Sequence, residues 1–245
     1  MIPYERQQKI LSIIEKEELV KIDQLLELFP EISSSTLRRD LKELEKNRKI
    51  EALSGGAVKK ISTVGEIPIS TRQMLNSEKK EKIADIAEHY IEDGDIIYLD
   101  SGSTCTAIFK KIMQKNITIY TSNTDVFAFG KNIRAQVIIL GGLFNPINSS
   151  ISGSLTEDVL NKLYFNKAFI GANGLDAKRG VMTPTFEEAL KKKMVKEHSD
   201  QTYLVCDSTK FHVLSNVKAF DLKDVIVITD QMDNNLSEHV SLITD

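Results

Sequence analysis

The stretch SSSTLRRDLKELEK, residues 33–46, decides the fold of the first part of this chain. Any of the hydroxyl side chains at 33–36 can cap the N-terminus of a helix. At about 100° per residue, Leu37, Leu41 and Leu44 share one face, which should be buried. Most cations take another face, which should point outward. They are Arg38, Arg39, Lys42 and Lys46.

Such a helix has the residues needed to read DNA in the major groove. Small hydroxyls and arginines near the N-terminus suit base edges, and lysines suit phosphates. The candidate DNA-binding residues are Ser33, Ser34, Ser35, Thr36, Arg38, Arg39 and Lys42. A solvated charged face on an ordinary helix is the alternative, and an isolated basic stripe would favour it.

The neighbouring sequence decides between these two interpretations. Apolar residues at helical spacing predict two short helices before the basic one, near residues 10–14 and 22–29, and Pro30 ends the second. A turn at Gly55-Gly56 then separates two extended runs, residues 49–53 and 57–61. Three helices and a hairpin form a winged helix-turn-helix, which we expect over residues 1–60 with double-stranded operator DNA as its partner.

Length and charge limit the remaining possibilities. A chain of 245 residues suggests two domains. Its net charge of −3 argues against non-specific coating of nucleic acid, although a local DNA-reading face remains compatible with it. No apolar stretch approaches the roughly 20 residues of a membrane span, and no signal peptide is expected. Cys105 and Cys206 form no disulfide framework, so both fit core positions of a cytoplasmic protein.

The rest of the chain has the pattern of an α/β domain. Residues 61–77 have no sustained period and predict a linker. From residue 78 to 245, short apolar runs alternate with helical stretches, which is typical of a mostly parallel sheet covered by helices. These runs are residues 95–100, 117–121, 136–140, 167–171, 202–206 and 225–229.

Polar or glycine-rich turns follow five of these runs. They are residues 101–104, Thr121-Ser122-Asn123, Gly141-Gly142, residues 171–174 and residues 207–210. Because the carboxyl ends of parallel strands line the usual ligand crevice, the turns together predict a shared polar pocket. The turn Asp100-Ser101-Gly102-Ser103-Thr104 leads from a strand into a helix N-terminus, which suits an anion. Each turn taken alone could be a plain connection.

The same motifs resemble a known family. The motifs of the first part are residues 35–41, Leu44 and residues 55–58. They closely resemble the DNA-binding domain of the DeoR family of bacterial regulators. The resemblance continues through the polar turns and covers roughly residues 4–230. One departure concerns the wing, where the family usually has arginine or histidine before the double glycine and this chain has residues 51–54, Glu-Ala-Leu-Ser. Strong wing contacts on that side are therefore not expected, although Lys59 and Lys60 could reach a phosphate.

The resemblance implies roles for particular residues. Thr36, Arg38 and Arg39 would contact DNA, and Asp40 would serve structure as a salt-bridge or capping partner. The second domain would be a Rossmann-like, isomerase-like sensor for a phosphorylated sugar, with the phosphate held by residues 101–104. The sugar contacts, or the residues that complete the pocket, would be Asn123, Asn173, Glu187 and Lys210. For Glu187 the alternative is a favourable position at a helix N-terminus without any ligand.

Three functions are compatible with these residues. The first is a repressor of a sugar-metabolism operon whose operator affinity changes when a sugar phosphate binds. The second is an isomerase-like enzyme using Asp100, Glu187 and Lys210, but an isomerase has no use for a major-groove helix. The third is a DNA-binding module whose second domain only assembles the protein, and the polar strand ends argue against it.

The first function carries further expectations. Reading two half-sites predicts a homo-oligomer, either a dimer or a tetramer. The four histidines have no metal-ligand spacing, so no metal and no other cofactor are expected.

Overall fold

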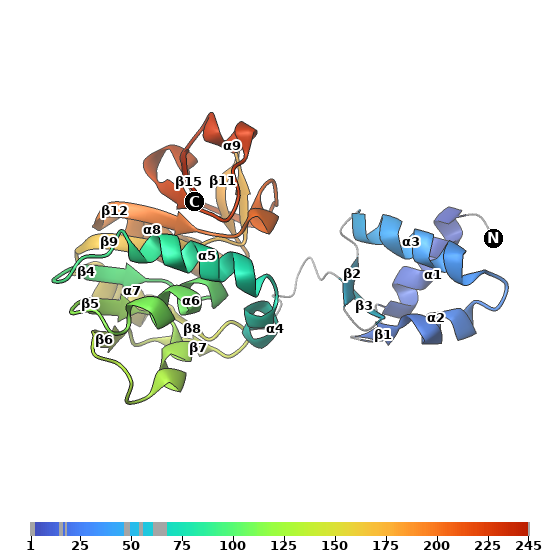
Figure 1. Ribbon diagram of the computed structural model, residues 1–245, viewed down its shortest axis with the longest axis horizontal. Coiled ribbons are helices and arrows are strands. Elements are labelled where there is room, and N and C mark those ends of the chain that lie inside the picture. The colour runs from blue at the N-terminus through green and yellow to red at the C-terminus, as the bar shows by residue number, and fades with distance from the viewer. Residues whose placement is uncertain are drawn as a thin grey trace. The chain divides into compact units, whose positions relative to one another are not determined.

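The computed structural model describes residues 3–14, 17, 19–46, 50–53, 56–60 and 68–244. The chain divides into two compact units, Met1–Gly65 and Glu66–Asp245 (Figure 1). Each unit has its own hydrophobic core, so each is described separately.

The first unit is the winged helix-turn-helix that the sequence predicts. Its elements are α1 (Pro3–Ile14), β1 (Val20–Lys21), α2 (Ile22–Leu28), α3 (Ser34–Lys46), β2 (Ile50–Leu53) and β3 (Ala57–Lys60). The strands form an antiparallel sheet in the order β1-β3-β2. Leu37, Leu41 and Leu44 of α3 are buried in the core of the unit, as the helical spacing predicts. The remaining residues of the two predicted hairpin runs and of the double-glycine turn, residues 49, 54–55 and 61, lie outside the described residues.

The second unit is built on a seven-stranded sheet in the order β15-β14-β12-β9-β4-β5-β6. The strands are β4 (Ile96–Leu99), β5 (Thr118–Thr121), β6 (Gln136–Ile139), β9 (Phe165–Gly171), β12 (Ser199–Val205), β14 (Ile226–Ile228) and β15 (Ser241–Ile243). Every neighbouring pair is parallel, and the six predicted runs supply all strands except β15. β15 has three residues, too short for its pattern to distinguish it from a loop.

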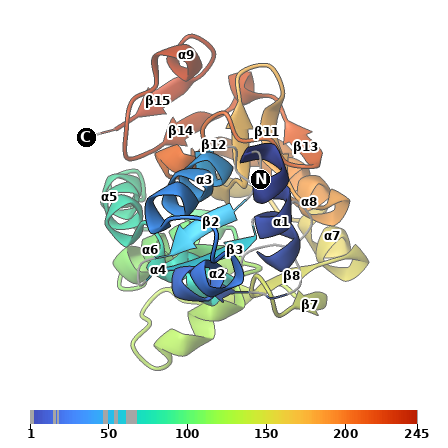
Figure 2. The same ribbon diagram turned by 90° about the vertical axis from the view of Figure 1, so that its right-hand side faces the viewer.

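Helices cover both faces of this sheet, as expected. Figure 2 shows α5 (Ser77–Glu88) and α6 (Ser103–Ile112) on one side of the strands and α7 (Ser154–Leu160) and α8 (Phe186–Glu197) on the other. Alternate residues of each strand enter opposite cores, because successive side chains in a strand point to opposite faces. Thus Ile97 and Leu99 pack below α5 and α6, whereas Tyr98 packs on the α8 side.

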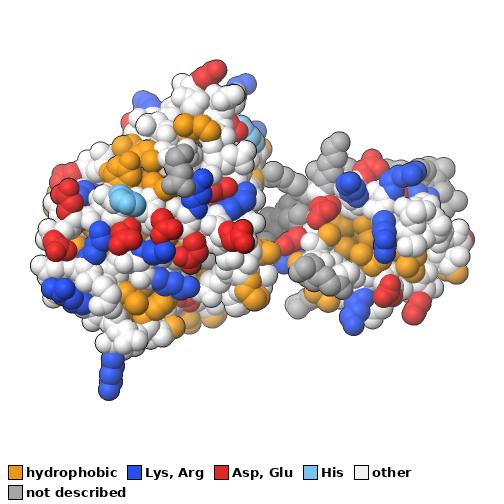
Figure 3. All heavy atoms as spheres, viewed as in Figure 1, with side chains coloured by type: hydrophobic (Ala, Val, Ile, Leu, Met, Phe, Trp, Pro, Cys, Tyr) orange, Lys and Arg blue, Asp and Glu red, His pale blue; other side chains and the backbone are white. Residues whose placement is uncertain are grey.

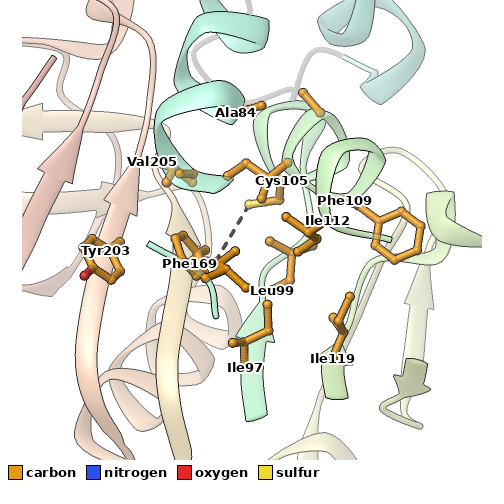
Figure 4. Packing of buried hydrophobic residues seen from close by; sticks show 14 of the residues in the cluster. Ala84, Ile97, Leu99, Cys105, Phe109, Ile112, Ile119, Phe169, Tyr203 and Val205 are labelled. Atoms are coloured by element: carbon orange, nitrogen blue, oxygen red, sulfur yellow. Dashed lines mark hydrogen bonds between the residues drawn. The ribbon is translucent and has the colours of Figure 1, made fainter. Parts of the chain in front are cut away.

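Both cysteines are free and buried in these two cores. Figure 4 shows Cys105 of α6 beside Phe169 of β9, whose carbonyl oxygen accepts from its Sγ at 3.9 Å. Burial raises the pKa of the Cys105 thiol and raises that of Cys206 to about 12. Thiols this protonated are poor nucleophiles, so both act as small core residues, as the sequence suggests.

Short elements that the sequence did not predict surround the main sheet. They are β7 (Leu143–Asn145), β8 (Ser150–Ser152), β10 (Gly174–Asp176), β11 (Gly180–Thr183), β13 (Val217–Phe220), α9 (Asn234–Ser237) and the 3-10 turns η1 (Thr124–Phe129), η2 (Ser208–Lys210) and η3 (Leu222–Asp224). β7 pairs with β8, and β10-β11-β13 form a small antiparallel sheet. Gly174 is required there, because a Cβ atom would lie 2.2 Å from the Val213 carbonyl oxygen.

The linker expected over 61–77 coincides only partly with the structure. Residues 61–67 lie outside the described residues, and helix α4 (Ile69–Met74) belongs to the second unit. Ile69 is buried, and its N–H donates to the Ile147 carbonyl oxygen at 2.8 Å. A helix of six residues is too short to show a period, so tertiary contacts decide this segment.

Candidate DNA-binding and effector sites

Helix α3 begins with a side-chain cap. The Ser33 hydroxyl accepts from the Thr36 N–H at 3.2 Å, and the Ser33 carbonyl accepts from the Leu37 N–H at 3.0 Å. Ser33 Oγ also lies 2.9 Å from the hydroxyls of Ser35 and Thr36. Ser33 therefore stabilises the N-terminus of the helix that carries the other DNA-binding candidates.

The basic face of α3 is open to solvent. Arg38, Arg39 and Lys42 are exposed, as are Ser34 and Ser35, while Thr36 is half-buried. Figure 3 shows Lys and Arg side chains in blue over the part of the first unit where α3 lies.

The carboxylates of α3 are occupied elsewhere. Asp40 is buried and accepts from Nε of Arg6 and, at 3.0 Å, from Arg6 Nη2, which confirms its structural role. Glu43 accepts from Gln7 at 3.2 Å, and Glu45 accepts from the Ala52 N–H at 3.0 Å. Because these acceptors are committed to protein donors, the arginines keep their charge available for DNA.

The wing offers less positive charge than its sequence suggests. Lys59 Nζ lies 3.1 Å from Glu51 Oε2 on the paired strand. That ion pair neutralises the lysine that was expected to reach a phosphate. The side chain of Lys60 lies outside the described residues.

In the second unit, the order of the main sheet reverses between β4 and β9. From β4 the chain continues outward through β5 and β6, and from β9 it continues in the other direction through β12, β14 and β15. In open α/β sheets, ligands bind outside the carboxyl ends of strands at such a switch point. Residues 101–104 follow β4 and residues 172–174 follow β9, so two of the predicted polar turns meet there.

The turn after β4 opens helix α6. Gly102 has φ 114°, a conformation that side chains rarely adopt, and it precedes the first helical residue, Ser103. Ser101, Gly102, Ser103 and Thr104 are half-buried. The first N–H groups of a helix have no intrahelical acceptor and carry the positive end of its dipole. Ser103 and Thr106 line a cavity of about 290 Å³, whose wall also carries Lys80 and Lys110 and the carboxylates Glu81 and Asp125. The helix N-terminus is the part of this wall that suits an anion.

Asp100 is enclosed by donors from the protein itself. One carboxylate oxygen accepts from the Ser101 N–H at 2.9 Å, and the other accepts from Lys192 Nζ and, at 3.3 Å, from the Gly171 N–H. Lys191 Nζ lies 3.8 Å from the first oxygen. Burial alone would raise the pKa of Asp100, but Lys192 and Lys191 hold it below its ordinary value. Asp100 is thus a buried anion that bonds the turn after β4 to the end of β9.

Thr121, which ends β5, and the two residues after it are also buried and internally bonded. Thr121 Oγ1 donates to the Leu99 carbonyl at 2.6 Å, and Ser122 Oγ accepts from Lys191 Nζ at 3.0 Å. Asn123 Nδ2 donates to Thr106 Oγ1 at 2.9 Å. These bonds hold α6 and the end of β4 in place. Asn123 does not line the cavity, but it bonds to Thr106 and accepts from the Asp125 N–H at 3.0 Å, and both of these residues do.

The other candidates differ in environment. Gly141 and Gly142 are exposed after β6, and a Cβ atom on Gly142 would lie 2.2 Å from Thr156 Oγ1. Asn173 and Lys210 are half-buried at the ends of β9 and η2. Glu187 is exposed at the start of α8.

Glu188, beside it, is the buried acidic residue of α8. It accepts from Thr183 Oγ1 at 2.6 Å and from Asn148 Nδ2 at 2.7 Å. The buried glutamate at the start of α8 is therefore Glu188, whereas the expected site residue, Glu187, is exposed.

Sequence reasoning did not single out the buried lysines of the second unit. Lys191 and Lys192 lie on the buried side of α8 with Glu188, Ala189 and Val195. Their three- and four-residue spacing from these neighbours was the available signal. Lys80 of α5 is buried as well, and it has the same spacing from the buried Ile83 and Ala84 of its helix.

Two further properties hold for the described part of the chain. No helix in it has the length and apolar character needed to cross a bilayer. Within the same residues, no three His, Cys, Asp or Glu side chains gather where they could hold a metal ion.

Together these features define a DNA-binding regulator with an α/β sensor unit, and comparison with known proteins identifies its family. The DeoR-like helix-turn-helix domain matches residues 6–63, and the DeoR C terminal sensor domain matches residues 75–231. The chain belongs to the DeoR family of transcriptional regulators, as its motifs indicated, and is a sequence-specific DNA-binding transcriptional regulator.

Relatives align along nearly the whole chain. The uncharacterized HTH-type transcriptional regulator YulB of Bacillus subtilis is 33% identical over 94% of this chain and 90% of its own. The lactose phosphotransferase system repressor of Streptococcus mutans is 29% identical over 98% and 97%, respectively. Among solved structures, ribose 5-phosphate isomerase A from Methanocaldococcus jannaschii is 15% identical, with a TM-score of 0.41, over 56% of this chain and 55% of that one.

Proposed function

We propose that this protein represses a sugar-metabolism operon and that a phosphorylated sugar changes its affinity for double-stranded operator DNA. The observation that carries the proposal is the turn before α6, an anion-binding geometry at the switch point of a sheet. The relatives include two proteins named lactose phosphotransferase system repressors, which supports a sugar-linked operon.

In this proposal the phosphate accepts hydrogen bonds from the N–H groups and hydroxyls of residues 101–104. Charge-assisted hydrogen bonds are roughly twice as strong as neutral ones, so the phosphate supplies most of the discrimination. Asn173, Lys210 and Glu187 contact the sugar. Asp100 and residues 121–123 hold the turn in position, because their polar atoms already bond within the protein.

A regulator is favoured over an isomerase-like enzyme by the state of Asp100. A general base needs a pKa near the operating pH, whereas the pKa of Asp100 is lowered and both its oxygens are occupied. Glu187, a second candidate for proton transfer, is exposed.

The proposal is tested by titrating the full chain with matched phosphorylated and free sugars in a calorimeter. The free sugar should bind at least tenfold more weakly, about 1.4 kcal/mol. Operator sequences are then selected from random duplex DNA. Fluorescence anisotropy with these duplexes measures the DNA affinity of the protein with and without the sugar phosphate.

The variant Ser103→Asp places a carboxylate at the proposed phosphate position. It should bind operator as the wild type does and no longer respond to the sugar phosphate, because like charges repel at close range. Ser154→Asp is a matched control, since Ser154 also follows a glycine at the start of a helix. Equal binding of the two sugars, or an undiminished response in Ser103→Asp, would refute the proposed site.

A further inference from the structure

The cavity beside the turn before α6 has walls of two chemical kinds. Its α6 side contributes the hydroxyls of Ser103 and Thr106, in the first turns of a helix whose N-terminus suits an anion. Another part of the wall is η1, which contributes the carboxylate of Asp125. A phosphate alone gains nothing from that carboxylate, because like charges repel. Asp125 therefore needs a hydrogen-bond donor from another part of the ligand.

Asp125 is held in this wall by its own neighbours. Its N–H donates to Asn123 Oδ1 at 3.0 Å, and the next residue, Val126, is buried in the core below α5 and α6. Asp125 Oδ2 accepts from Gln73 Nε2 of α4 at 2.7 Å. The residue is half-buried. These contacts position the carboxylate in advance of any ligand, which reduces the free-energy cost of ordering it on binding.

The carboxylate of Asp125 keeps unused acceptor capacity. An ionised carboxylate has about four lone-pair sites. Among the described residues, Gln73 is the one donor bonded to it. Hydroxyl groups donate charge-assisted hydrogen bonds to a carboxylate. An occupant of the cavity that covers Asp125 without such donors would remove it from water with its lone pairs unsatisfied, which is unfavourable.

Asn123 connects the two parts of the wall. Its Nδ2 donates to Thr106 Oγ1 at 2.9 Å, while its Oδ1 accepts from the Asp125 N–H. Thr106 Oγ1 in turn donates to the Gly102 carbonyl oxygen at 3.2 Å. This chain of hydrogen bonds fixes the position of Asp125 relative to the α6 turn. The protein therefore sets the spacing between a phosphate at the turn and a donor at Asp125.

The other groups of the wall leave Asp125 as the acceptor for a small polar ligand. A volume of about 290 Å³ is at the lower end of small-molecule pockets and suits a single monosaccharide. Lys80 and Lys110 balance the formal charges of Glu81 and Asp125. Lys111, outside the cavity, lies 3.7 Å from Glu81 Oε2, and the Glu81 side chain is 47% exposed. Asp125 has no ion pair among the described residues and is less open to water.

We propose, resting on the phosphorylated-sugar effector above, that Asp125 is a specificity-determining residue. It accepts hydrogen bonds from hydroxyl groups of a monosaccharide whose phosphate lies at the α6 turn. This contact is additional to those of Asn173, Lys210 and Glu187, which do not line the cavity. A site built to bond a hydroxyl rejects the analogue that lacks it, because the polar group of the site is then left unpaired. Asp125 thus distinguishes a sugar phosphate from inorganic phosphate.

The binding test titrates the full chain with inorganic phosphate and with ribose 5-phosphate, glucose 6-phosphate, fructose 6-phosphate and galactose 6-phosphate in a calorimeter. The sugar phosphate that binds most tightly should bind the wild type at least tenfold more tightly than inorganic phosphate does. Asp125→Ala should weaken its binding at least tenfold. Asp125→Asn should lie in between, because its amide oxygen is a neutral and weaker acceptor.

Inorganic phosphate should respond in the opposite direction. Both Asp125 variants should bind it as tightly as the wild type or more tightly, because a repelling charge is gone. Damage to the fold would instead weaken both ligands. Asp158→Asn is the matched control, because Asp158 is exposed on α7 and does not line the cavity. Circular dichroism and thermal midpoints verify folding. Asp125→Asn, which can still accept from Gln73, preserves the test should Asp125→Ala not fold.

A deoxy series tests the contact itself. Analogues of the most tightly bound sugar phosphate, each lacking one hydroxyl, are titrated into the wild type and Asp125→Ala. Removing the hydroxyl that bonds Asp125 should weaken wild-type binding and have little further effect in Asp125→Ala, because that interaction is already absent. Additive losses for every hydroxyl would show that Asp125 bonds none of them.

The outcomes separate this inference from the proposed function. Unchanged sugar-phosphate affinity in Asp125→Ala, or equal weakening of both ligands, together with lost binding in Ser103→Asp, would overturn the role of Asp125 and leave the proposed phosphate site standing. A wild type that binds inorganic phosphate as tightly as every sugar phosphate would overturn that role as well. Lost preference in Asp125→Ala with normal binding in Ser103→Asp would support Asp125 as a sugar contact and remove the α6 turn from the site.

Discussion

At the scale of single residues, the DNA-reading face depends on which charges are free. Glu51 neutralises Lys59, and Arg6 is bonded to Asp40, whereas Arg38 and Arg39 are exposed on α3. Sequence patterns place all of these residues on the correct elements. They do not show which cation has a carboxylate beside it, because such pairs join separate elements.

The first prediction follows from that difference. Arg38→Ala and Arg39→Ala should each weaken operator binding by about 1–3 kcal/mol, the usual contribution of a bidentate base contact. Anisotropy titrations at fixed salt measure the loss, and the thermal midpoint should remain that of the wild type. Lys59→Ala is the internal comparison and should lose much less. Two arginine variants with wild-type affinity would exclude α3 as the reading helix.

At the scale of elements, the junction of β4, β9 and α8 is held by a buried charge cluster. Asp100 accepts from Lys192 of α8 and from the Gly171 N–H at the end of β9. The sequence identified the Asp100 turn from its position after an apolar run. It did not indicate that the lysines of α8 point inward to that carboxylate, since a Lys-Lys-Lys run usually marks a solvated face.

The second prediction concerns the pH dependence of this junction. The folded-state pKa of Asp100 is below its ordinary value of 3.8, so its contribution to stability is complete above that pH. The contribution is lost as the pH falls below about 4 toward the folded-state pKa. Asp100→Asn should therefore be less stable than the wild type at pH 7, and the difference should narrow on acidification. Urea unfolding midpoints between pH 7 and pH 3 measure this, and a constant difference would contradict it.

The start of the second unit shows the same limit at element scale. Apolar runs and spacing predicted α5 and six of the seven strands of the main sheet, because burial imposes such a pattern. Helix α4 has six residues and strands β7 and β8 have three each, too few to show a sustained pattern. Their positions follow from contacts with other elements, which no local pattern records.

At the scale of the whole molecule, the second unit carries a patch of exposed apolar side chains. Leu143 and Phe144 on β7 are 74% and 52% exposed, and Leu155 and Val159 on α7 are 67% and 41% exposed. β7 pairs with β8, which leads through Gly153 directly into α7, so these residues share one surface. Contiguous apolar surface of this kind often marks a protein interface.

The third prediction is that the protein forms a homo-oligomer, a dimer or a tetramer, through this patch. A second copy is the expected occupant, because a helix-turn-helix regulator gains affinity by pairing two half-sites. Light scattering at micromolar concentration should give at least twice the mass of one chain. Leu155→Asp should shift it toward the monomer, whereas Leu214→Asp, at another exposed leucine, should not. A monomeric wild type would contradict the prediction.

The sequence by itself determined the two-unit organisation, the winged helix-turn-helix, the parallel sheet and the turns that follow its strands. Each of these depends on a period or a short motif, which is local information. Only the tertiary structure decided that β4 and β9 meet at the switch point and that Asp100 is enclosed by two lysines of α8. These contacts join residues 71 (Asp100 to Gly171) to 92 (Asp100 to Lys192) positions apart, and the free energy of such contacts depends on burial that exists only in the folded chain.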